Sequence, residues 1–247
     1  SPGRADEPSN GSLWGCLAQA VWAVRHHDTF ADAVTAAIDL GDDTDTVATV
    51  TGAIAGARSS IQGIPSRWLT PLNGRVTTPT GDEFYDNARL QDLARRLLGR
   101  KAVPMTTMEP PAGPHAVAER LHAANLPGAA TAPTDWAVVS MCRTHGLLEH
   151  HPVRREVFLI DQAEPANVDA ATALRDAVDT IDAFLAEGRD VVVHCHGGRS
   201  RTGLVLKAWA MRTHGWDERT AHDWLQGCWP LYEDYQTSFV ELLREEW

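Results

Sequence analysis

Apolar side chains recur at helical spacing in the first hundred residues of the chain. Between residues 12 and 37 this pattern predicts two helices that are joined near residue 27. The large apolar members of one stripe on the first helix are Trp14, Leu17, Val21 and Val24. Small residues at every third or fourth position between 47 and 57 predict a tightly packed helix after an acidic turn, and a last amphipathic helix is predicted over residues 88–98. No segment before residue 100 alternates as a strand does, so we expect this part to be all helical.

The pattern changes after residue 101. A proline-rich stretch, interrupted by a predicted helix over residues 115–124, leads to three predicted strands. These strands cover residues 136–142, 156–160 and 191–194. A helix predicted over residues 169–187 separates the last two, and strands that alternate with helices indicate an α/β fold with a mainly parallel sheet. We therefore expect an all-α partial domain over residues 1–100 and an α/β domain over residues 101–247.

Composition and net charge restrict the function classes. Of the 247 residues, 43% are hydrophobic and 22% charged, a balance typical of globular proteins and not of disordered or collagen-like ones. The formal net charge of −11 disfavours nucleic acid and anionic membranes as partners, so local chemistry must hold any phosphate-bearing partner. No apolar run approaches the roughly 20 residues that span a bilayer, which predicts no membrane association.

The cysteines and the first residues indicate the cellular context. Four widely spaced cysteines without a Cys-x-x-Cys pair predict reduced thiols and a cytoplasmic protein, and they argue against a zinc site or a disulfide framework. The sequence at Ser1 has neither a signal-peptide pattern nor an initiator methionine, so we expect the chain to begin inside a longer protein.

The most specific chemical motif surrounds Cys195. Three valines and His194 precede this cysteine, and a loop with two glycines leads from it into an apolar helix. The backbone N–H groups of such a loop can point at a phosphate, and the helix N-terminus adds a favourable dipole. The same field, with a nearby guanidinium, lowers the pKa of a thiol from its free value of about 8.5 and favours the nucleophilic thiolate. Arg201 can return across the loop and bind two phosphate oxygens with its planar fork.

The segment from His194 to Gly203, with its Cys-x5-Arg pattern and following threonine, resembles the signature loop of the dual-specificity branch of the protein tyrosine phosphatases. This resemblance covers roughly residues 101–247 and implies a four- or five-stranded sheet flanked by helices. It implies that Cys195 takes the phosphoryl group from a phosphorylated protein or a small phosphomonoester, that Arg201 stabilises the transferring group, and that Thr202 helps the thiolate leave. It requires no cofactor. The expected phosphate-binding residues are His196, Gly197, Gly198, Arg199 and Ser200.

Two alternatives remain open at this loop. Members with this motif that lack turnover act as phosphate-binding modules, and a buried thiol at a strand end is the structural interpretation of Cys195. The basic residues His196 and Arg199 are compatible with a substrate that carries several phosphates, or with an Arg199 that points to solvent.

The reaction also needs a general acid for the leaving-group oxygen. Asp161 ends a predicted strand and precedes Cys195 by 34 positions, where the family places its acid. Glu164 and Asp169 are the alternatives, and a turn residue at the strand exit is the structural interpretation of Asp161.

A second motif lies in the acidic turn after Gly41. Its carboxylates and hydroxyl belong to Asp43, Asp45 and Thr46, and such oxygens at a helix start can bind a hard cation such as magnesium. The turn and the helix after it resemble the C-terminal portion of the ADP-ribosylglycohydrolase family, which implies that these three residues are ligands of a paired magnesium centre that positions ADP-ribose.

The resemblance implies that the other acidic ligands come from an N-terminal half of the fold, which we expect to lie outside this chain. We therefore expect a half-site that binds magnesium weakly, with an acidic helix cap as the structural alternative. Magnesium-dependent hydrolysis of ADP-ribosyl bonds would require the missing half. An apolar surface left uncovered by that half would favour self-association.

Overall fold

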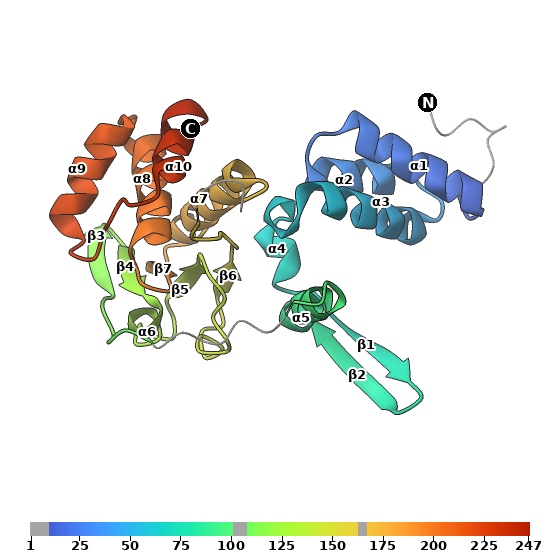
Figure 1. The fold of residues 1–247 in the computed structure, drawn as a ribbon, viewed down its shortest axis with the longest axis horizontal. Helices are drawn as coiled ribbons and strands as arrows, with labels where there is room; N and C mark the ends of the chain where they lie inside the picture. The colour runs from blue at the N-terminus through green and yellow to red at the C-terminus, as the bar shows by residue number, and fades with distance from the viewer. Residues whose placement is uncertain (1–9, 101–107, 163–166) are drawn as a thin grey trace. The chain divides into compact units, whose positions relative to one another are not determined.

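A computed structural model describes residues 10–100, 108–162 and 167–247 (Figure 1). These residues form two compact units. The first comprises the chain up to Pro65 together with Asn167–Ala173, and the second comprises Ser66–Ala166 and Leu174–Trp247. The domain boundary near residue 100 stays a prediction.

The first unit is helical. Its elements are α1 (Leu13–His26), α2 (Phe30–Asp39), α3 (Thr44–Ser59) and the 3-10 turn η1 (Ile61–Gly63). Ser12 caps α1 by accepting a hydrogen bond from the Gly15 N–H at 3.1 Å, and Thr29 caps α2 in the same way. The pair of helices predicted between residues 12 and 37, and the helix after the acidic turn, are confirmed.

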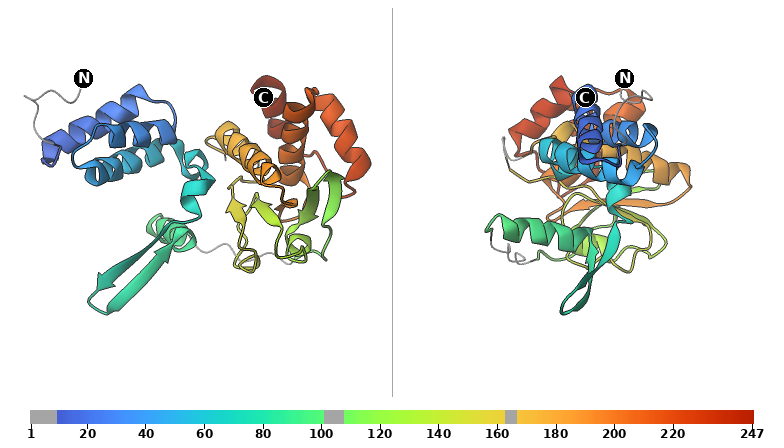
Figure 2. Two further views of the ribbon diagram at one scale, coloured as in Figure 1. Left: turned by 180° about the vertical axis from the view of Figure 1, so that it is seen from behind. Right: turned by 90° about the vertical axis from the view of Figure 1, so that its right-hand side faces the viewer.

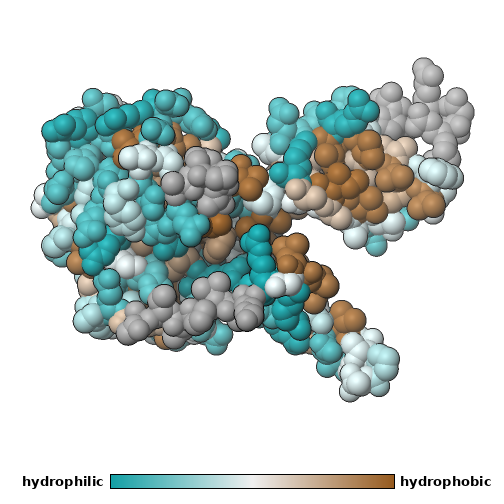
Figure 3. Space-filling model, viewed as in Figure 1, coloured by the Kyte–Doolittle hydropathy of each residue, from teal (hydrophilic) through white to brown (hydrophobic). Residues whose placement is uncertain are grey.

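The packing face of α1 differs from the predicted stripe. Small residues of α1 are buried against α2 and α3, among them Ala20 and Ala23 at 0% exposure. Trp14 is 73% exposed, and Leu17 and Val21 also reach the surface, so of the predicted stripe only Val24 is buried. Close approach of three short helices requires small side chains between them, and the large residues therefore face outward. Figure 3 shows apolar residues on the surface of this unit.

The second unit begins with a segment that the sequence analysis described incompletely. Its elements are α4 (Ser66–Leu69), the antiparallel strands β1 (Asn73–Thr78) and β2 (Gly81–Asp86), and α5 (Asn87–Leu97). The helix α5 is confirmed, and Asp86 caps it by accepting from the Arg89 N–H at 2.8 Å. The expectation of no strand before residue 100 is wrong. Most positions of the hairpin are exposed, so its strands carry little of the apolar alternation that reveals a half-buried strand.

A five-stranded sheet forms the centre of the second unit (Figures 1 and 2). Its strands are β3 (His115–Ala118), β4 (Leu121–Asn125), β5 (Ala137–Ser140), β6 (Arg154–Glu156) and β7 (Val191–Cys195). The order is β3-β4-β7-β5-β6, and every pairing except β3 with β4 is parallel. The central strand β7 is buried at all five positions, which explains its run of valines. The predicted α/β fold with a mainly parallel sheet is confirmed.

Helices complete this unit. They are α6 (Leu126–Ala129), α7 (Ala170–Ala186), α8 (Ser200–His214), α9 (Glu218–Cys228) and α10 (Thr237–Glu245), and the residues of α7 up to Ala173 belong to the first unit. Helix α8 contacts β7, and both α9 and α10 pack against α8. None of the helices in the described ranges has the length and apolarity that a bilayer span requires.

Two element predictions in this unit need correction. The helix predicted over residues 115–124 is the hairpin of β3 and β4, which reverses at Arg120 with φ of 57°. The strand predicted over residues 156–160 ends at Glu156, and the chain continues without regular structure, although the Val157 N–H still donates to the Ser140 carbonyl at 2.8 Å. The strand and helix predictions near β5, β7 and α7 are confirmed within a few residues.

Candidate active site

The candidate site lies where β7 ends. Cys195 is the last residue of β7 and is 1% exposed, and α8 begins five positions later at Ser200. In open parallel sheets, ligands bind beyond the carboxyl ends of the strands. The topology therefore puts the predicted loop at the edge of the sheet where chemistry is expected.

The loop between Cys195 and α8 turns its carbonyl groups away from its centre. The His196 carbonyl accepts from the Leu126 N–H at 3.2 Å, and the Gly198 carbonyl accepts from the Trp229 indole N–H at 2.6 Å. Gly198 has φ of 71°, and a Cβ on it would lie 2.9 Å from the Ala124 carbonyl oxygen. Only glycine fits this backbone, because other residues would be strained in the left-handed region and would also clash there.

This arrangement leaves a set of donors without partners. Among the described residues, nothing accepts a hydrogen bond from the backbone N–H groups of Gly197 through Thr202. The hydroxyl groups of Ser200 and Thr202 are buried and also lack partners there. Unpaired buried donors are costly in a folded protein, and together with the N-terminus of α8 they form a set that suits an oxyanion.

The Arg201 guanidinium is anchored by the segments that follow β5 and β6. Its Nη1 atom donates to the Met141 carbonyl at 3.2 Å and to the Leu159 carbonyl at 3.1 Å. Its Nε atom lies 3.5 Å from Asp161 Oδ2. The structure thus brings Arg201 and Asp161 together, and an anion that binds Nε would compete with the Asp161 carboxylate for it.

The Asp161 carboxyl is also held by two residues that the sequence analysis missed. The Tyr235 hydroxyl donates to Oδ2 at 2.8 Å, and the Gln236 side-chain amide lies 3.4 Å from Oδ1. Both residues precede α10, and no local pattern links them to a site so far away in sequence. Of the alternative acids, Asp169 caps α7 by accepting from the Thr172 N–H at 3.1 Å, and Glu164 lies outside the described residues.

Burial sets the protonation of two neighbours of Cys195. Burial lowers the pKa of His194 to about 4, so this imidazole is neutral at pH 7, and its Nε2 atom lies 2.6 Å from the Ser140 hydroxyl. Burial raises the pKa of Cys142 to about 12, which keeps this second thiol protonated. Cys142 is therefore no competing nucleophile at neutral pH. All four cysteines are free.

The contacts of His196 and Arg199, the two extra basic residues of the loop, differ from those expected of a second phosphate site. Arg199 pairs with Glu233 and lies 3.2 Å from Glu109. These carboxylates balance the charge of the Arg199 guanidinium. Arg199 therefore neither points freely to solvent nor remains unpaired for a phosphate. The backbone carbonyl group of His196 accepts a hydrogen bond from the Leu126 N–H.

The acidic turn belongs to the first unit, and the Asn10 side chain holds its backbone. Asp43 occupies the N-cap position of α3, and Asp45 and Thr46 lie in its first turn. The Asn10 side chain accepts from the Asp43 N–H at 3.0 Å and donates to the Gly41 carbonyl at 2.9 Å. Interactions with Thr46, foremost with its hydroxyl, lower the pKa of Asp43. The donor atoms suit magnesium in kind, and water would have to complete the octahedral coordination that the ion requires.

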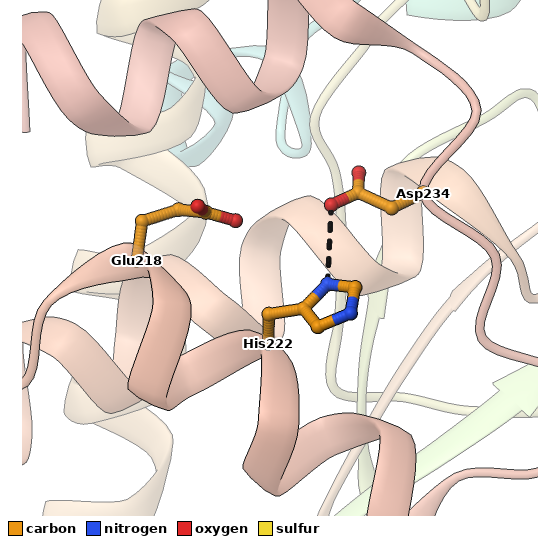
Figure 4. A group of neighbouring side chains, drawn as sticks. All are labelled: Glu218, His222 and Asp234. Carbon is orange, nitrogen blue, oxygen red and sulfur yellow. Dashed lines mark ion pairs between the residues drawn. The ribbon is translucent and has the colours of Figure 1, made fainter.

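One group of metal-ligand types gathers elsewhere within the described residues, at Glu218, His222 and Asp234 (Figure 4). The ammonium of Lys207, which is 1% exposed, lies 2.9 Å from Glu218 Oε1 and 2.6 Å from Asp234 Oδ2. This buried cation contacts both carboxylates, and Arg244 Nη2 also lies 2.8 Å from Glu218 Oε2, so two cations balance the two carboxylates. The group is therefore an ion-pair network that ties α8 to α9 and to the segment before α10, and it does not fit a metal site.

Two family models match successive parts of the chain. The ADP-ribosylglycohydrolase model matches residues 3–107, and the model described as dual specificity phosphatase, catalytic domain, matches residues 137–238. Both resemblances found in the sequence are thereby confirmed.

Similar proteins divide in the same way. The ADP-ribosylarginine hydrolase Tri1 of Serratia proteamaculans (strain 568) is 38% identical over 94 residues, which are 38% of this chain and 22% of that protein. Tri1 of Pseudomonas putida (strain GB-1) is 32% identical over 95 residues, 38% of this chain and 26% of that protein. The chain thus spans about a quarter of the length of these curated relatives.

Several solved structures are similar to part of this chain. Human DUSP28 matches with a TM-score of 0.47 and 20% identity over 57% of this chain and 97% of that one. A mouse putative dual specificity phosphatase, complexed with zinc tungstate, matches with a TM-score of 0.44 and 23% identity over 57% of this chain and 93% of that one.

Proposed function

Because the chain joins an ADP-ribosylglycohydrolase-like segment to a dual specificity phosphatase catalytic domain, we propose that it hydrolyses phosphomonoesters through a cysteinyl-phosphate on Cys195. One observation carries the proposal: the unpartnered N–H groups from Gly197 to Thr202, within the described residues, adjoin the anchored fork of Arg201 beside a buried cysteine. The phosphatase domain implies a phosphorylated substrate.

In the first step, the Cys195 thiolate attacks phosphorus and the bond from phosphorus to the leaving oxygen breaks. The loop N–H groups and Arg201 hold the charge on the three equatorial oxygens, which is where a phosphoryl-transfer transition state needs stabilisation. Asp161 gives its proton to the leaving oxygen, so that the product departs as an alcohol or phenol.

In the second step, water attacks the phosphocysteine. Asp161, now ionised, takes a proton from this water, and the sulfur–phosphorus bond breaks. The thiolate leaves and accepts a hydrogen bond from Thr202, whose hydroxyl is buried and has no partner among the described residues. Inorganic phosphate is released, and Cys195 returns to its starting form.

The carboxylates around Arg199 bear on substrate choice. Because Glu233 and Glu109 already pair with this guanidinium, it offers little net charge to a second phosphate. We therefore propose a substrate with a single phosphoryl group at the reacting position, either on a protein or on a small molecule.

Turnover of p-nitrophenyl phosphate in EDTA tests this function. Cys195→Ser should lower kcat by at least about 10³-fold because the nucleophile is lost, whereas Cys228→Ser, at a half-buried cysteine of α9, should leave kcat unchanged. Acid quenching of the wild type should trap a labelled phosphoenzyme. Equal rates for wild type and Cys195→Ser would overturn the proposal, and tight vanadate binding without turnover would identify a phosphate-binding module instead.

For the first hundred residues, the family match and the acidic turn favour a second candidate function. We propose that Asp43, Asp45 and Thr46 contribute to an ADP-ribose site only when the remainder of a glycohydrolase domain supplies the other ligands. Release of ADP-ribose from ADP-ribosylarginine, in magnesium, should be absent in this chain and should appear when that remainder is supplied. Activity that is unaffected by Asp43→Ala would contradict this role.

A further inference from the structure

The segment between α9 and α10 brings two side chains to the proposed general acid. The Tyr235 hydroxyl donates to Asp161 Oδ2 at 2.8 Å, and the Gln236 amide lies 3.4 Å from Oδ1. Tyr235 is 51% exposed, so its hydroxyl could be solvated by water instead. Burial of the Tyr235 ring therefore does not force its hydroxyl into contact with Asp161, and the contact is a specific one.

This segment is fixed to the helix that follows the phosphate loop. Asp234 accepts from Lys207 of α8 at 2.6 Å, and the Tyr232 ring packs where a Cβ on Gly203 of α8 would lie only 2.5 Å from it. Figure 4 shows Asp234 reaching His222 of α9. The neighbours of Tyr235 are therefore attached to the same helix that carries Arg201, which keeps the tyrosine in register with the loop.

The hydrogen bond between Tyr235 and Asp161 suits both steps of the proposed reaction. Asp161 Oδ2 faces the Tyr235 hydroxyl and also lies 3.5 Å from Arg201 Nε. A bound phosphoryl group competes for Arg201, and the tyrosine hydroxyl is then the closer remaining partner of Oδ2. A hydroxyl can donate to a carboxylate and accept from a carboxylic acid, so one residue can hold Asp161 before and after it gives up its proton.

We infer that Tyr235 is a positioning residue that holds the Asp161 carboxyl in line with the leaving-group oxygen. The inference rests on the proposed function, because it assigns Tyr235 a role only through Asp161. General acid catalysis matters most when the leaving group is a poor one, since a good leaving group departs without a proton.

The test compares two aryl phosphates within each protein. Tyr235→Phe removes one oxygen atom and keeps the ring. We expect kcat/KM for phenyl phosphate to fall about tenfold, while kcat/KM for p-nitrophenyl phosphate falls less than twofold, because kcat/KM excludes the hydrolysis of the phosphoenzyme that both substrates share. Because the ratio of the two rates is measured on one sample, a smaller folded fraction does not change it. Tyr85→Phe is the matched control, since Tyr85 also donates to a carboxylate, Glu83, at 3.0 Å but lies outside the proposed site.

Two further variants separate the outcomes. Adding Tyr235→Phe to Asp161→Asn should change neither rate further, because the tyrosine acts through the carboxyl. An unchanged phenyl-to-nitrophenyl ratio in Tyr235→Phe, or an equal further loss in the double variant, would overturn the inference. If Cys195→Ser also keeps full turnover, the proposed function fails as well, and if Cys195→Ser is inactive, only the role of Tyr235 fails.

Discussion

At the scale of single residues, Gly198 decides whether the phosphate loop can close. Its positive φ and its approach to the Ala124 carbonyl leave no room for a side chain, whereas Gly197 beside it has neither restriction and faces only the flexible Arg199 side chain. The two glycines of the loop therefore have different functions, although they are equivalent in the sequence pattern.

This difference predicts the effect of two alanine substitutions. Gly198→Ala should cost about 1–2 kcal/mol of folding free energy from backbone strain alone and should weaken vanadate binding, because the loop N–H groups shift. Gly197→Ala should change both properties much less. Urea unfolding and vanadate titration of the two variants measure this, and equal effects would contradict the strain argument.

His194 makes stability depend on pH. Burial lowers its pKa to about 4 in the folded protein from 6.5, so the unfolded chain binds the proton more tightly. The stability that His194 contributes is present above pH 6.5 and is lost as the pH falls toward 4, by about 3 kcal/mol in total.

Urea unfolding of wild type and His194→Asn across this pH range checks the prediction. The other histidines are common to both proteins, so the difference between the two curves isolates His194. We expect this difference to shrink as the pH falls, and parallel curves would contradict a neutral buried imidazole.

At the scale of elements, α8 combines the phosphate loop with the buried Lys207. Its ammonium lies between Glu218 and Asp234. Lys207→Met should destabilise the protein by about 3–5 kcal/mol, because Glu218 and Asp234 lose the buried cation that lies between them, and Arg244 remains beside Glu218 alone. Adding Glu218→Gln and Asp234→Asn should recover part of this loss, as measured by the urea midpoint. No recovery would indicate that packing, and not charge, explains the effect.

Elements were predictable from sequence where local signals and tertiary packing agree. The valine run of β7 and the apolar spacing of α7 each specify one structure, and both predictions are confirmed. The alanine-rich segment of β3 and β4 has the propensity of a helix, but pairing of β4 with the distant β7 determines its structure. Such a pairing cannot be read from a window of the sequence.

The candidate site divides in the same way. Cys195 and Arg201 lie in one contiguous motif, so the sequence alone brings them together. Tyr235 reaches Asp161 from 74 positions away, through the anchoring of its segment on α8. The sequence therefore predicts the loop chemistry, whereas the support around the acid depends on tertiary contacts that leave no local pattern.

At the scale of the whole molecule, the net charge of −11 contrasts with the chemistry at one loop. The groups around Cys195 are N–H donors, hydroxyls and a guanidinium, which bind anions and do not coordinate a cation. Turnover of p-nitrophenyl phosphate should therefore be the same in EDTA and in magnesium. A loss in EDTA that magnesium restores would contradict this assignment of charge stabilisation.

The burial of Lys207 has a practical consequence for labelling. The chain has two lysines, Lys101 and Lys207, and the second is 1% exposed. An amine-directed reagent should therefore leave α8 unmodified in the native protein and react with Lys207 only after that helix has separated from its carboxylate partners. Mass spectrometry of pulse-labelled samples would then use this one amine as a reporter of local unfolding next to the phosphate loop.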